Sequence, residues 1–383
     1  MRSISQTPLD GHPEKSENPQ AVDKGGRAMG FESELKKTVK SLGGWFNAHA
    51  HIDRAFVMET KYVEHADMDP WEIATYPLEA KQHTTGALHE GLAYTNKSLE
   101  ERMGRALETA IEYGTSRLDS FIDTTADLIG LKALEVALDL KEQFKGRIDF
   151  RVGAYPIFGF IDSEKRRWEV FEEGARMADF IGTLPERDMR ASHIGLKDHF
   201  KRVIELGNKL DGKEIHMHVD QTNRPDENGT ETLIEAVRWL RPDARGHSSK
   251  RQPTVWAVHA LSIASYSEER FQRVLEGLKE INMGVIVCPS ATLSNKQYRD
   301  IMVPMHNSIT RVLELLLADI PIRLGSDNVE DFFMPAGSLD MYLELREAAN
   351  ALRFYNFTTW AKIATGNRLN EIDKMKIKNA LNS

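Results

Sequence analysis

The stretch WFNAHAHID, residues 45–53, joins a short apolar run to two histidines that stand one residue apart. Gly43 and Gly44 end a helical pattern just before it, so the run is predicted to be a buried strand. Alternate residues of a strand point to the same side, and His49 and His51 therefore face one way. Two imidazoles at the end of one strand can bind a single metal ion.

Further apolar or β-branched runs follow, separated by longer amphipathic stretches. The predicted strands cover residues 45–51, 116–122, 149–155, 178–183, 214–220, 254–259, 284–288 and 321–326. The intervals carry apolar residues at three- and four-residue spacing, as between residues 99 and 113, which predicts helices. This alternation is typical of a parallel sheet covered by helices. Eight such units predict an α/β fold, a (β/α)8 or TIM barrel, and 383 residues are enough for one.

Two segments depart from this alternation. Residues 1–30 contain no aromatic residue and many Ser, Pro, Gly, Lys and Glu, so we expect a flexible polar tail before a barrel domain at 31–383. Residues 57–98 form a long connection that carries several aromatic residues, among them Trp71. Loops at the carboxyl ends of barrel strands build active sites, so this insertion is predicted to wall the site. The alternative is that it packs on a neighbouring subunit.

Charge and composition restrict the partners. A net charge of −8 and a pI near 5.9 disfavour binding to nucleic acid, which needs clustered Lys and Arg. The single cysteine, Cys288, cannot form an internal disulfide, and no apolar run reaches the roughly 18 residues of a membrane span. The first residues lack the apolar core of a secretory signal. We expect a cytoplasmic protein with a small-molecule substrate and no membrane partner.

Other candidate metal ligands stand at the ends of later predicted strands. His218 lies near the end of the fifth predicted strand, His259 ends the sixth, and Asp327 follows the eighth. His49, His51, His218 and Asp327 together offer three imidazoles and a carboxylate, which suit one divalent ion: zinc first, with ferrous iron or manganese as alternatives. His216 faces the same side of its strand as His218 and is its rival.

These residues, in this order and at these strand ends, resemble the amidohydrolase superfamily. The motifs are His49-Ala50-His51-Ile52-Asp53, His218-Val219-Asp220, His259 and Ser326-Asp327-Asn328, with supporting similarity in GSDNV at 325–329, DFFMP at 331–335 and GNRL at 366–369. The likeness spans residues 45 to about 372. It is greatest to the branch of cytosine deaminase and N-isopropylammelide amidohydrolase.

The resemblance implies a metal-dependent hydrolase and assigns roles to its residues. It favours His218 over His216 as the ligand, with His216 one layer deeper in the core. His259 would orient the water or the substrate, and Asp327 would also take the proton of the water. Superfamily members with two metals carry a lysine at the end of the fourth strand, where this chain reads FIGTLP at 180–185. One ion is therefore expected.

Two departures from the family bear on the chemistry. Gln221 replaces the carboxylic acid that carries a proton in cytosine deaminase, and an amide has no proton of useful pKa. Either Asp220 replaces that acid, or Asp327 both deprotonates water and protonates the leaving amine. The second is our hypothesis. After the third strand, Ile157 and Phe158 stand where cytosine deaminase has a base-reading glutamine, which favours a bulkier or more apolar substrate than cytosine. Alternatively, they merely pack the barrel rim.

A third departure concerns architecture. Superfamily deaminases usually carry a β-sandwich built from both chain ends, and residues 371–383 after the last helical pattern are too few for it. We expect a bare barrel with peripheral helices and a homo-oligomer that covers the exposed surface. Substrate contacts are expected from the loops at the strand ends, namely Ile157, Phe158, Asn328, Asp123 and Trp71.

The predicted function is hydrolysis of a C–N bond. Deamination of a nitrogen heterocycle, such as a pyrimidine, triazine or pterin, or release of an amine from one, is the first interpretation. Hydrolysis of an acyclic or cyclic amide with Asp327 as sole acid and base is the alternative. A metal-binding barrel that has lost turnover is a third interpretation, of which Gln221 would be the first sign.

Overall fold

The computed structural model describes residues 30–240, 252–295 and 307–382. The polar tail expected at 1–30 lies outside this range, except for Gly30. Among the described residues, no helix combines the length and the apolar character needed to cross a membrane.

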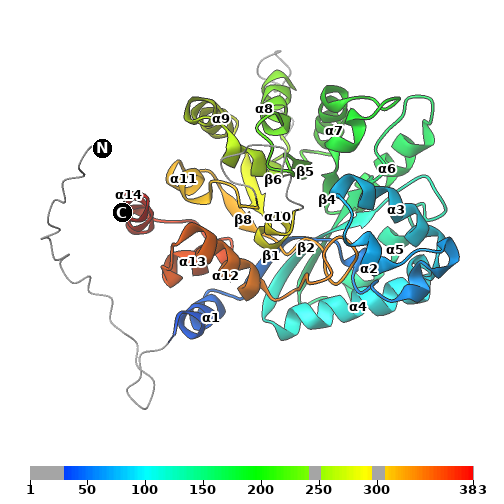
Figure 1. Ribbon diagram of the computed structural model, residues 1–383, viewed down its shortest axis with the longest axis horizontal. Helices are drawn as coiled ribbons and strands as arrows, with labels where there is room; N and C mark the ends of the chain where they lie inside the picture. Colours follow the sequence, from blue (N-terminus) through cyan, green and yellow to red (C-terminus); the bar gives the residue numbers. More distant parts are fainter. Residues whose placement is uncertain (1–29, 241–251, 296–306, 383) are drawn as a thin grey trace, which may run out of the picture.

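Eight parallel strands form one sheet in sequence order, and the sheet closes on itself (Figure 1). The strands are β1 (Trp45–Ala50), β2 (Thr115–Asp123), β3 (Asp149–Tyr155), β4 (Phe180–Thr183), β5 (Ile215–Val219), β6 (Val255–His259), β7 (Gly284–Val287) and β8 (Ile322–Leu324). The backbone N–H of Asp327 donates to the His49 oxygen at 2.9 Å, and the N–H of His51 donates to the Asp327 oxygen at 3.1 Å. These bonds join the first strand to the last, so the predicted TIM barrel is confirmed.

Helices surround the barrel and follow its strands. They include α4 (Asn96–Glu112), α5 (Lys132–Gln143), α6 (Arg166–Met177), α7 (Leu196–Lys209), α8 (Gly229–Leu240), α9 (Glu268–Glu280), α10 (Pro289–Leu293) and α11 (Val312–Leu317). After β8 come α12 (Met341–Leu352), α13 (Phe357–Ala364) and α14 (Glu371–Asn382), and α1 (Phe31–Ser41) packs on α13. All named strands of the described ranges belong to the barrel.

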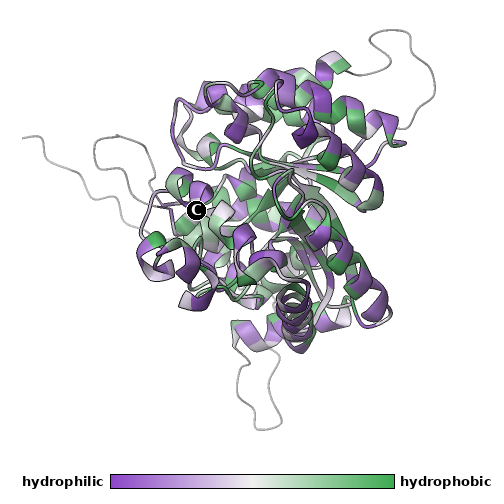
Figure 2. Cartoon of the chain, turned by 90° about the vertical axis from the view of Figure 1, so that its right-hand side faces the viewer, coloured by the Kyte–Doolittle hydropathy of each residue, from purple (hydrophilic) through white to green (hydrophobic). Residues whose placement is uncertain are grey.

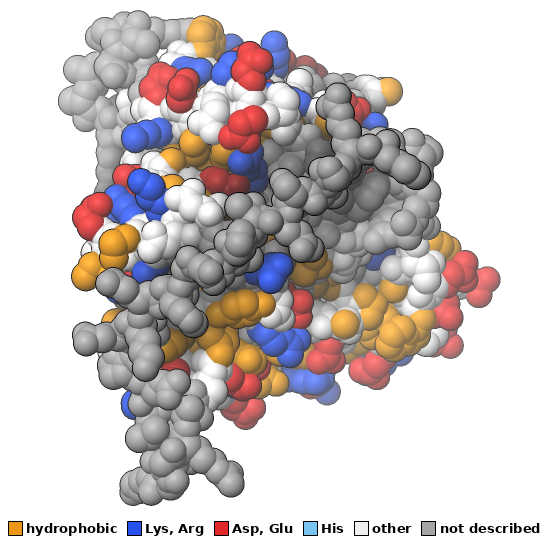
Figure 3. Space-filling view, turned by 60° about the vertical axis from the view of Figure 1, so that its left-hand side comes forward, with side chains coloured by type: hydrophobic (Ala, Val, Ile, Leu, Met, Phe, Trp, Pro, Cys, Tyr) orange, Lys and Arg blue, Asp and Glu red, His pale blue; other side chains and the backbone are white. Residues whose placement is uncertain are grey.

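Buried apolar residues form a cluster on each side of the sheet. One apolar cluster fills the barrel interior and includes Phe46, Phe121, Phe180 and Trp256, while a larger one lies between the strands and the helices. Figure 2 shows the hydrophobic residues gathered on the strands and on the inward faces of the helices. On the face in Figure 3, acidic and basic side chains are interspersed wherever side chains are described.

A small residue permits the closure at the carboxyl end of the barrel strands. A Cβ atom on Gly325 would lie 2.6 Å from the Cβ of His49, so only glycine lets β8 approach β1 this closely. Beside it, the Asn47 side chain donates to Ser326 Oγ at 2.7 Å and accepts from the Ser326 N–H at 3.1 Å. The histidine motif and Asp327 are thereby held in register.

The insertion at 57–98 is mostly helical, which is a different arrangement from the long loop expected. It contains α2 (Pro70–Ile73), α3 (Leu78–Glu90) and three short 3-10 turns at Thr60–Tyr62, Glu64–Ala66 and Leu92–Tyr94. Arg102 of α4 fixes both ends of the segment, because its guanidinium donates to the backbone oxygens of Asp53, Ala55 and Ala93 at 2.6 to 2.7 Å.

Candidate metal centre

Four side chains from three parts of the barrel meet at the carboxyl ends of its strands. His49 Nε2 lies 3.2 Å from His218 Nε2 and 3.5 Å from Asp327 Oδ1. His51 Nε2 lies 3.5 Å from the same Asp327 oxygen. Potential ligand atoms of His49, His51 and His218 fall within 4.8 Å of one another, and so do those of His49, His259 and Asp327. These four residues and His259 are all buried.

The hydrogen bonds of His218 set its tautomer. Its Nδ1 lies 3.0 Å from the backbone oxygen of Thr183, an acceptor, so Nδ1 carries the proton and Nε2 offers a lone pair to the centre. Burial lowers the pKa of His49, His51 and His218 well below the usual range. Neutral imidazoles are the form that binds a metal ion.

The donor atoms of this cluster suit a divalent cation. Three imidazole nitrogens and a carboxylate converge on one point. The Nδ1 atoms of His49, His51 and His259 are buried and, within the described ranges, have no hydrogen-bond partner that would fix their protons. With Nδ1 protonated, as in His218, the Nε2 atoms would be free to bind a cation, and zinc accepts this donor set.

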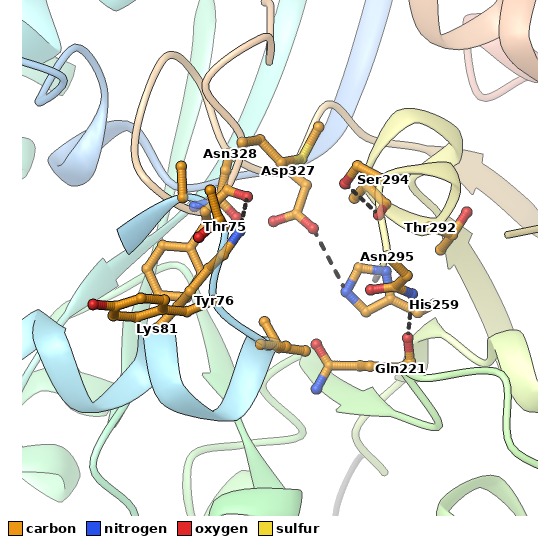
Figure 4. A pocket seen from close by; sticks show the side chains of 15 residues that line it. Thr75, Tyr76, Lys81, Gln221, His259, Thr292, Ser294, Asn295, Asp327 and Asn328 are labelled. Atoms are coloured by element: carbon orange, nitrogen blue, oxygen red, sulfur yellow. Dashed lines mark hydrogen bonds and ion pairs between the residues drawn. The ribbon is translucent and has the colours of Figure 1, made fainter. Parts of the chain in front are cut away.

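His259 and Asp327 face each other across the open side of the centre (Figure 4). His259 Nε2 lies 3.7 Å from Asp327 Oδ2, and burial lowers the pKa of His259 to about 4. Both residues have left-handed backbone angles, with φ of 69° and 62°. Strained backbone of this kind persists where surrounding structure holds a functional group in place.

His216 lies deeper in the barrel, as the resemblance implied. Its ring stacks on Phe180 with centroids 4.5 Å apart, and its Nε2 lies 3.1 Å from Glu214. Glu214 also accepts from Arg151 and Arg323 at the opposite end of the strands. His216 therefore belongs to a structural polar network.

The two residues after β5 are used differently. The carboxylate of Asp220 accepts the backbone N–H groups of Gly229 at 2.6 Å and Thr230 at 2.8 Å. Asp220 thus caps the first turn of α8, which is a structural task, and in the described part of the chain no hydrogen bond links its carboxylate to the candidate metal ligands. Gln221 lines the cavity beside His259 and Asp327.

An acid that the sequence reading missed lies behind Gln221. The Nε2 of Gln221 donates to Glu186 Oε2 at 2.6 Å. Burial and the neighbouring carboxylates of Glu227 and Asp220 raise the pKa of Glu186 well above its usual range. Glu186 directly follows the FIGTLP segment at 180–185. A carboxylate one residue beyond Pro185 was the available signal.

A cavity of about 250 Å³ opens over the centre. The insertion forms one wall, in agreement with the lining role, through Thr75, Tyr76, Leu78 and Lys81 (Figure 4). Asn328 is the one residue of the five expected substrate contacts that lines this cavity. Lys81 was not singled out by the sequence, since only the fold brings α3 over the barrel.

The other expected contacts lie elsewhere. Ile157 is buried in the interior cluster, as the packing alternative proposed, and Phe158 lines a separate cavity. Trp71 is 61% exposed. Asp123 is fully buried, and its carboxylate accepts from Arg54 at 3.2 Å and from Tyr94 at 2.8 Å. These positions give Ile157 and Asp123 packing and ion-pair roles.

Comparison with known proteins agrees with this geometry, although no protein-family model matches the sequence. An uncharacterized protein of Haemophilus influenzae is 28% identical over 289 residues, 75% of this chain and 95% of that protein. N-isopropylammelide isopropyl amidohydrolase of Pseudomonas sp. is 24% identical over 333 residues, 83% of this chain and 72% of the enzyme. Pterin deaminase of Rhizobium rhizogenes is 24% identical over 272 residues, 70% of this chain and 58% of the enzyme.

The fold is shared with solved structures of the same group. The 5-methylcytosine deaminase of Klebsiella pneumoniae, liganded with 5-fluorocytosine, superposes with a TM-score of 0.70 at 19% identity, covering 88% of this chain and 74% of that one. The sequence relatives and this shared barrel agree with the strand-end motifs described above. The chain is thus similar to the amidohydrolase superfamily, and its curated relatives support the branch of N-isopropylammelide amidohydrolase and the heterocycle deaminases.

Proposed function

We propose that this protein hydrolyses a C–N bond other than a peptide bond, with one divalent cation, zinc in the first place, and a nitrogen heterocycle as substrate. The convergence of His49, His51, His218 and Asp327 on one point carries the proposal. The relatives whose names state an activity, an amidohydrolase and a deaminase, support the reaction class.

The residues around the centre can divide the proton transfers between them. A zinc ion held by this donor set would supply a water of lowered pKa and a Lewis acid for the carbon under attack. Asp327 faces both the histidines and the cavity, so it can take a proton from water and return it to the departing nitrogen. His259, neutral because of its burial, can hydrogen-bond the oxygen that develops charge.

Hydrolysis of a cyclic or acyclic amide is the second candidate function. One observation favours it: Gln221 occupies the position of the family acid, and its amide donates to Glu186. An amide cannot supply the ring-directed proton, whereas amide cleavage requires only a proton at the leaving nitrogen. Asp327 can deliver that proton alone.

Release of ammonia or amine tests both candidates. The purified protein, with its metal content measured, is incubated with aminopyrimidines, aminotriazines, N-alkylaminotriazines, pterins and simple amides. Amine release from heterocycles with one equivalent of metal supports the first candidate, and release from amides alone supports the second. A protein that binds one equivalent of metal and releases no amine from any of these compounds contradicts both.

A further inference from the structure

Arg187 is a buried cation without an acceptor. It lies in the 3-10 turn Pro185–Met189 that follows β4, and it is only 8% exposed. Its Nε and Nη1 atoms are buried and have no hydrogen-bond partner in the described part of the chain. A guanidinium keeps its charge near neutral pH, and buried charges in proteins are normally paired. The partner of Arg187 is therefore expected among the ligands of the protein.

The two acids beside Arg187 in the sequence are bound to other groups. Asp188 accepts from the backbone N–H of Phe160 at 2.7 Å, and its carboxylate lies 2.7 Å from Nδ1 of His199. Glu186 contacts the side chain of the glutamine that lines the cavity. No ion pair between described residues includes Arg187. The turn thus places a cation between two acids and pairs it with neither.

Two further arginines lie near Arg187. Burial lowers the pKa of Arg187 to about 10, and the charges of Arg190 and Arg167 add to this shift. Both neighbours have acceptors: Arg167 Nη1 donates to the backbone oxygen of Phe158 at 2.9 Å, and Arg190 lies 3.1 Å from Glu79. The charge without a partner is therefore a single one, and a monoanion such as a carboxylate can balance it.

Arg187 lies on the side of the metal centre that the loop after β3 forms. A Cβ atom on Gly159 of this loop would lie 3.1 Å from Cγ of Arg187, so the loop packs on the stem of the side chain. Tyr155, at the end of β3, interacts electrostatically with Arg187. The centroid of the Tyr155 ring lies 5.1 Å from that of His51 and 5.4 Å from that of His218. Tyr155 is thus a neighbour both of Arg187 and of two candidate ligands.

We propose that Arg187 is a specificity-determining residue that binds a carboxylate group of the substrate beside Tyr155. This inference rests on the proposed function and deepens it, because it names the substrate class: nitrogen heterocycles that carry a carboxylate. The guanidinium donates its N–H groups to the carboxylate oxygens, and charge-assisted hydrogen bonds of this kind are about twice as strong as neutral ones. An uncharged analogue leaves the charge of Arg187 unbalanced, so the site selects against it.

Equilibrium binding tests the inference without turnover. The zinc-loaded protein is titrated near neutral pH with pyrimidine-5-carboxylate and its near-isostere pyrimidine-5-carboxamide, and then with pyridine-3-carboxylate and pyridine-3-carboxamide. Hydrogen bonds to a charged group predict that the carboxylate of at least one pair binds about tenfold tighter or more. Equal binding within both pairs, tighter binding of the carboxamides, or binding of none of the four overturns the inference.

The variant Arg187→Gln separates this contact from binding of the carboxylate to the zinc ion. We expect its preference for the carboxylates to fall below about threefold. The matched control is Arg167→Gln, which removes a neighbouring charge that already has acceptors and should keep the preference of the wild type. A preference that persists in Arg187→Gln means that the carboxylate binds elsewhere. Equal losses in the two variants mean that the general positive field attracts the anion. Either result overturns the assignment of Arg187.

Unfolding gives a second readout, which a structural role of Arg187 would change in the opposite direction. Arg102 is also buried, but it donates three hydrogen bonds to backbone oxygens. Without added ligand, Arg187→Met removes an unpaired buried charge, so its urea midpoint should equal or exceed that of the wild type. Arg102→Met should unfold at a lower urea concentration, because three carbonyl groups lose their donor. A midpoint of Arg187→Met below that of the wild type would make Arg187 a structural cation and overturn the inference.

The outcomes also separate this inference from the proposed function. Carboxylate binding that depends on Arg187, without amine release from any compound, contradicts the proposed function and leaves the carboxylate site intact. Amine release with equal binding of carboxylates and carboxamides contradicts only the carboxylate site.

Discussion

The Nε2 atoms of His49 and His218 lie 3.2 Å apart, although 169 positions separate the two residues in the sequence. Because His218 Nδ1 faces the Thr183 oxygen, His218 Nε2 presents a lone pair to His49. Burial keeps the pKa of both residues low, so neither is protonated near neutral pH. Such a pair is arranged to share a cation.

The first prediction concerns metal content. Replacing His218 by Ala removes one of the four proposed ligands. Loss of a residue that only hydrogen-bonds to a ligand costs about 10- to 100-fold in metal affinity, so loss of the ligand itself should cost more than about 100-fold. Zinc affinity is measured by competition with a chelator. The matched control is His216→Ala on the same strand face, which should retain the wild-type affinity. Equal affinities in the two variants would contradict the ligand assignment.

The second prediction concerns proton transfer by Asp327. Asp327→Asn keeps an oxygen near His49 and His51 but cannot accept a proton, so kcat should fall by about 10²- to 10⁴-fold. Metal content is measured in the same samples and turnover is normalised to it. If normalised activity persists in Asp327→Asn, this carboxylate is not the acid and base.

The third prediction separates Asp220 from catalysis. Its carboxylate accepts two backbone N–H groups of α8, so Asp220→Asn leaves one of them unsatisfied and should cost about 1–3 kcal/mol of unfolding free energy. The change in kcat should stay below about tenfold, well under the loss of a general acid. Urea denaturation and turnover at saturating substrate give the two numbers. If Asp220→Asn is as stable as the wild type but loses more than about tenfold in kcat, Asp220 is the general acid after all.

The sequence was sufficient for the barrel and for the candidate ligands, for a physical reason. Strands buried on both faces are continuous apolar runs, and the third predicted strand coincides with β3 at residues 149–155. Residues that directly follow such strands must meet at one rim. His49, His51, His218 and Asp327 were therefore predictable as neighbours before any coordinates existed.

Side-chain partners across the rim were not predictable in this way. The contact between Gln221 and Glu186 joins residues 35 positions apart, and it depends on how two loops turn after their strands. Asp220 was a candidate for the family acid, but its backbone turns to a φ of 55°, and the carboxylate caps α8. The helix α3 has a weak apolar pattern, so its place over the cavity follows from tertiary contacts alone.

The insertion is held on the barrel by a buried ionic cluster. His89 of α3 lies between two carboxylates: its Nε2 is 3.1 Å from Asp123, and its Nδ1 is 2.5 Å from Asp127. Tyr94 donates to Asp53 at 3.0 Å and to Asp123 at 2.8 Å. Burial alone would lower the pKa of His89, but the bonds to Asp123 and Asp127 outweigh it and raise this pKa to about 9.

The fourth prediction follows from that shift. The folded protein holds the His89 proton more tightly than the unfolded chain does. The contribution of protonated His89 to the unfolding free energy is therefore complete below about pH 6.5 and disappears as the pH rises through about 9. A shift of this size corresponds to roughly 3 kcal/mol. His89→Gln should therefore lower the unfolding free energy by about that amount at pH 6 and by much less at pH 9.5. Urea titrations at the two pH values measure the difference.

The control His83→Gln alters an exposed histidine of the same helix and should show no such dependence. A His89→Gln deficit that grows with pH would mean that His89 is neutral in the folded protein, and the insertion would then be held by Tyr94 and Arg102 instead.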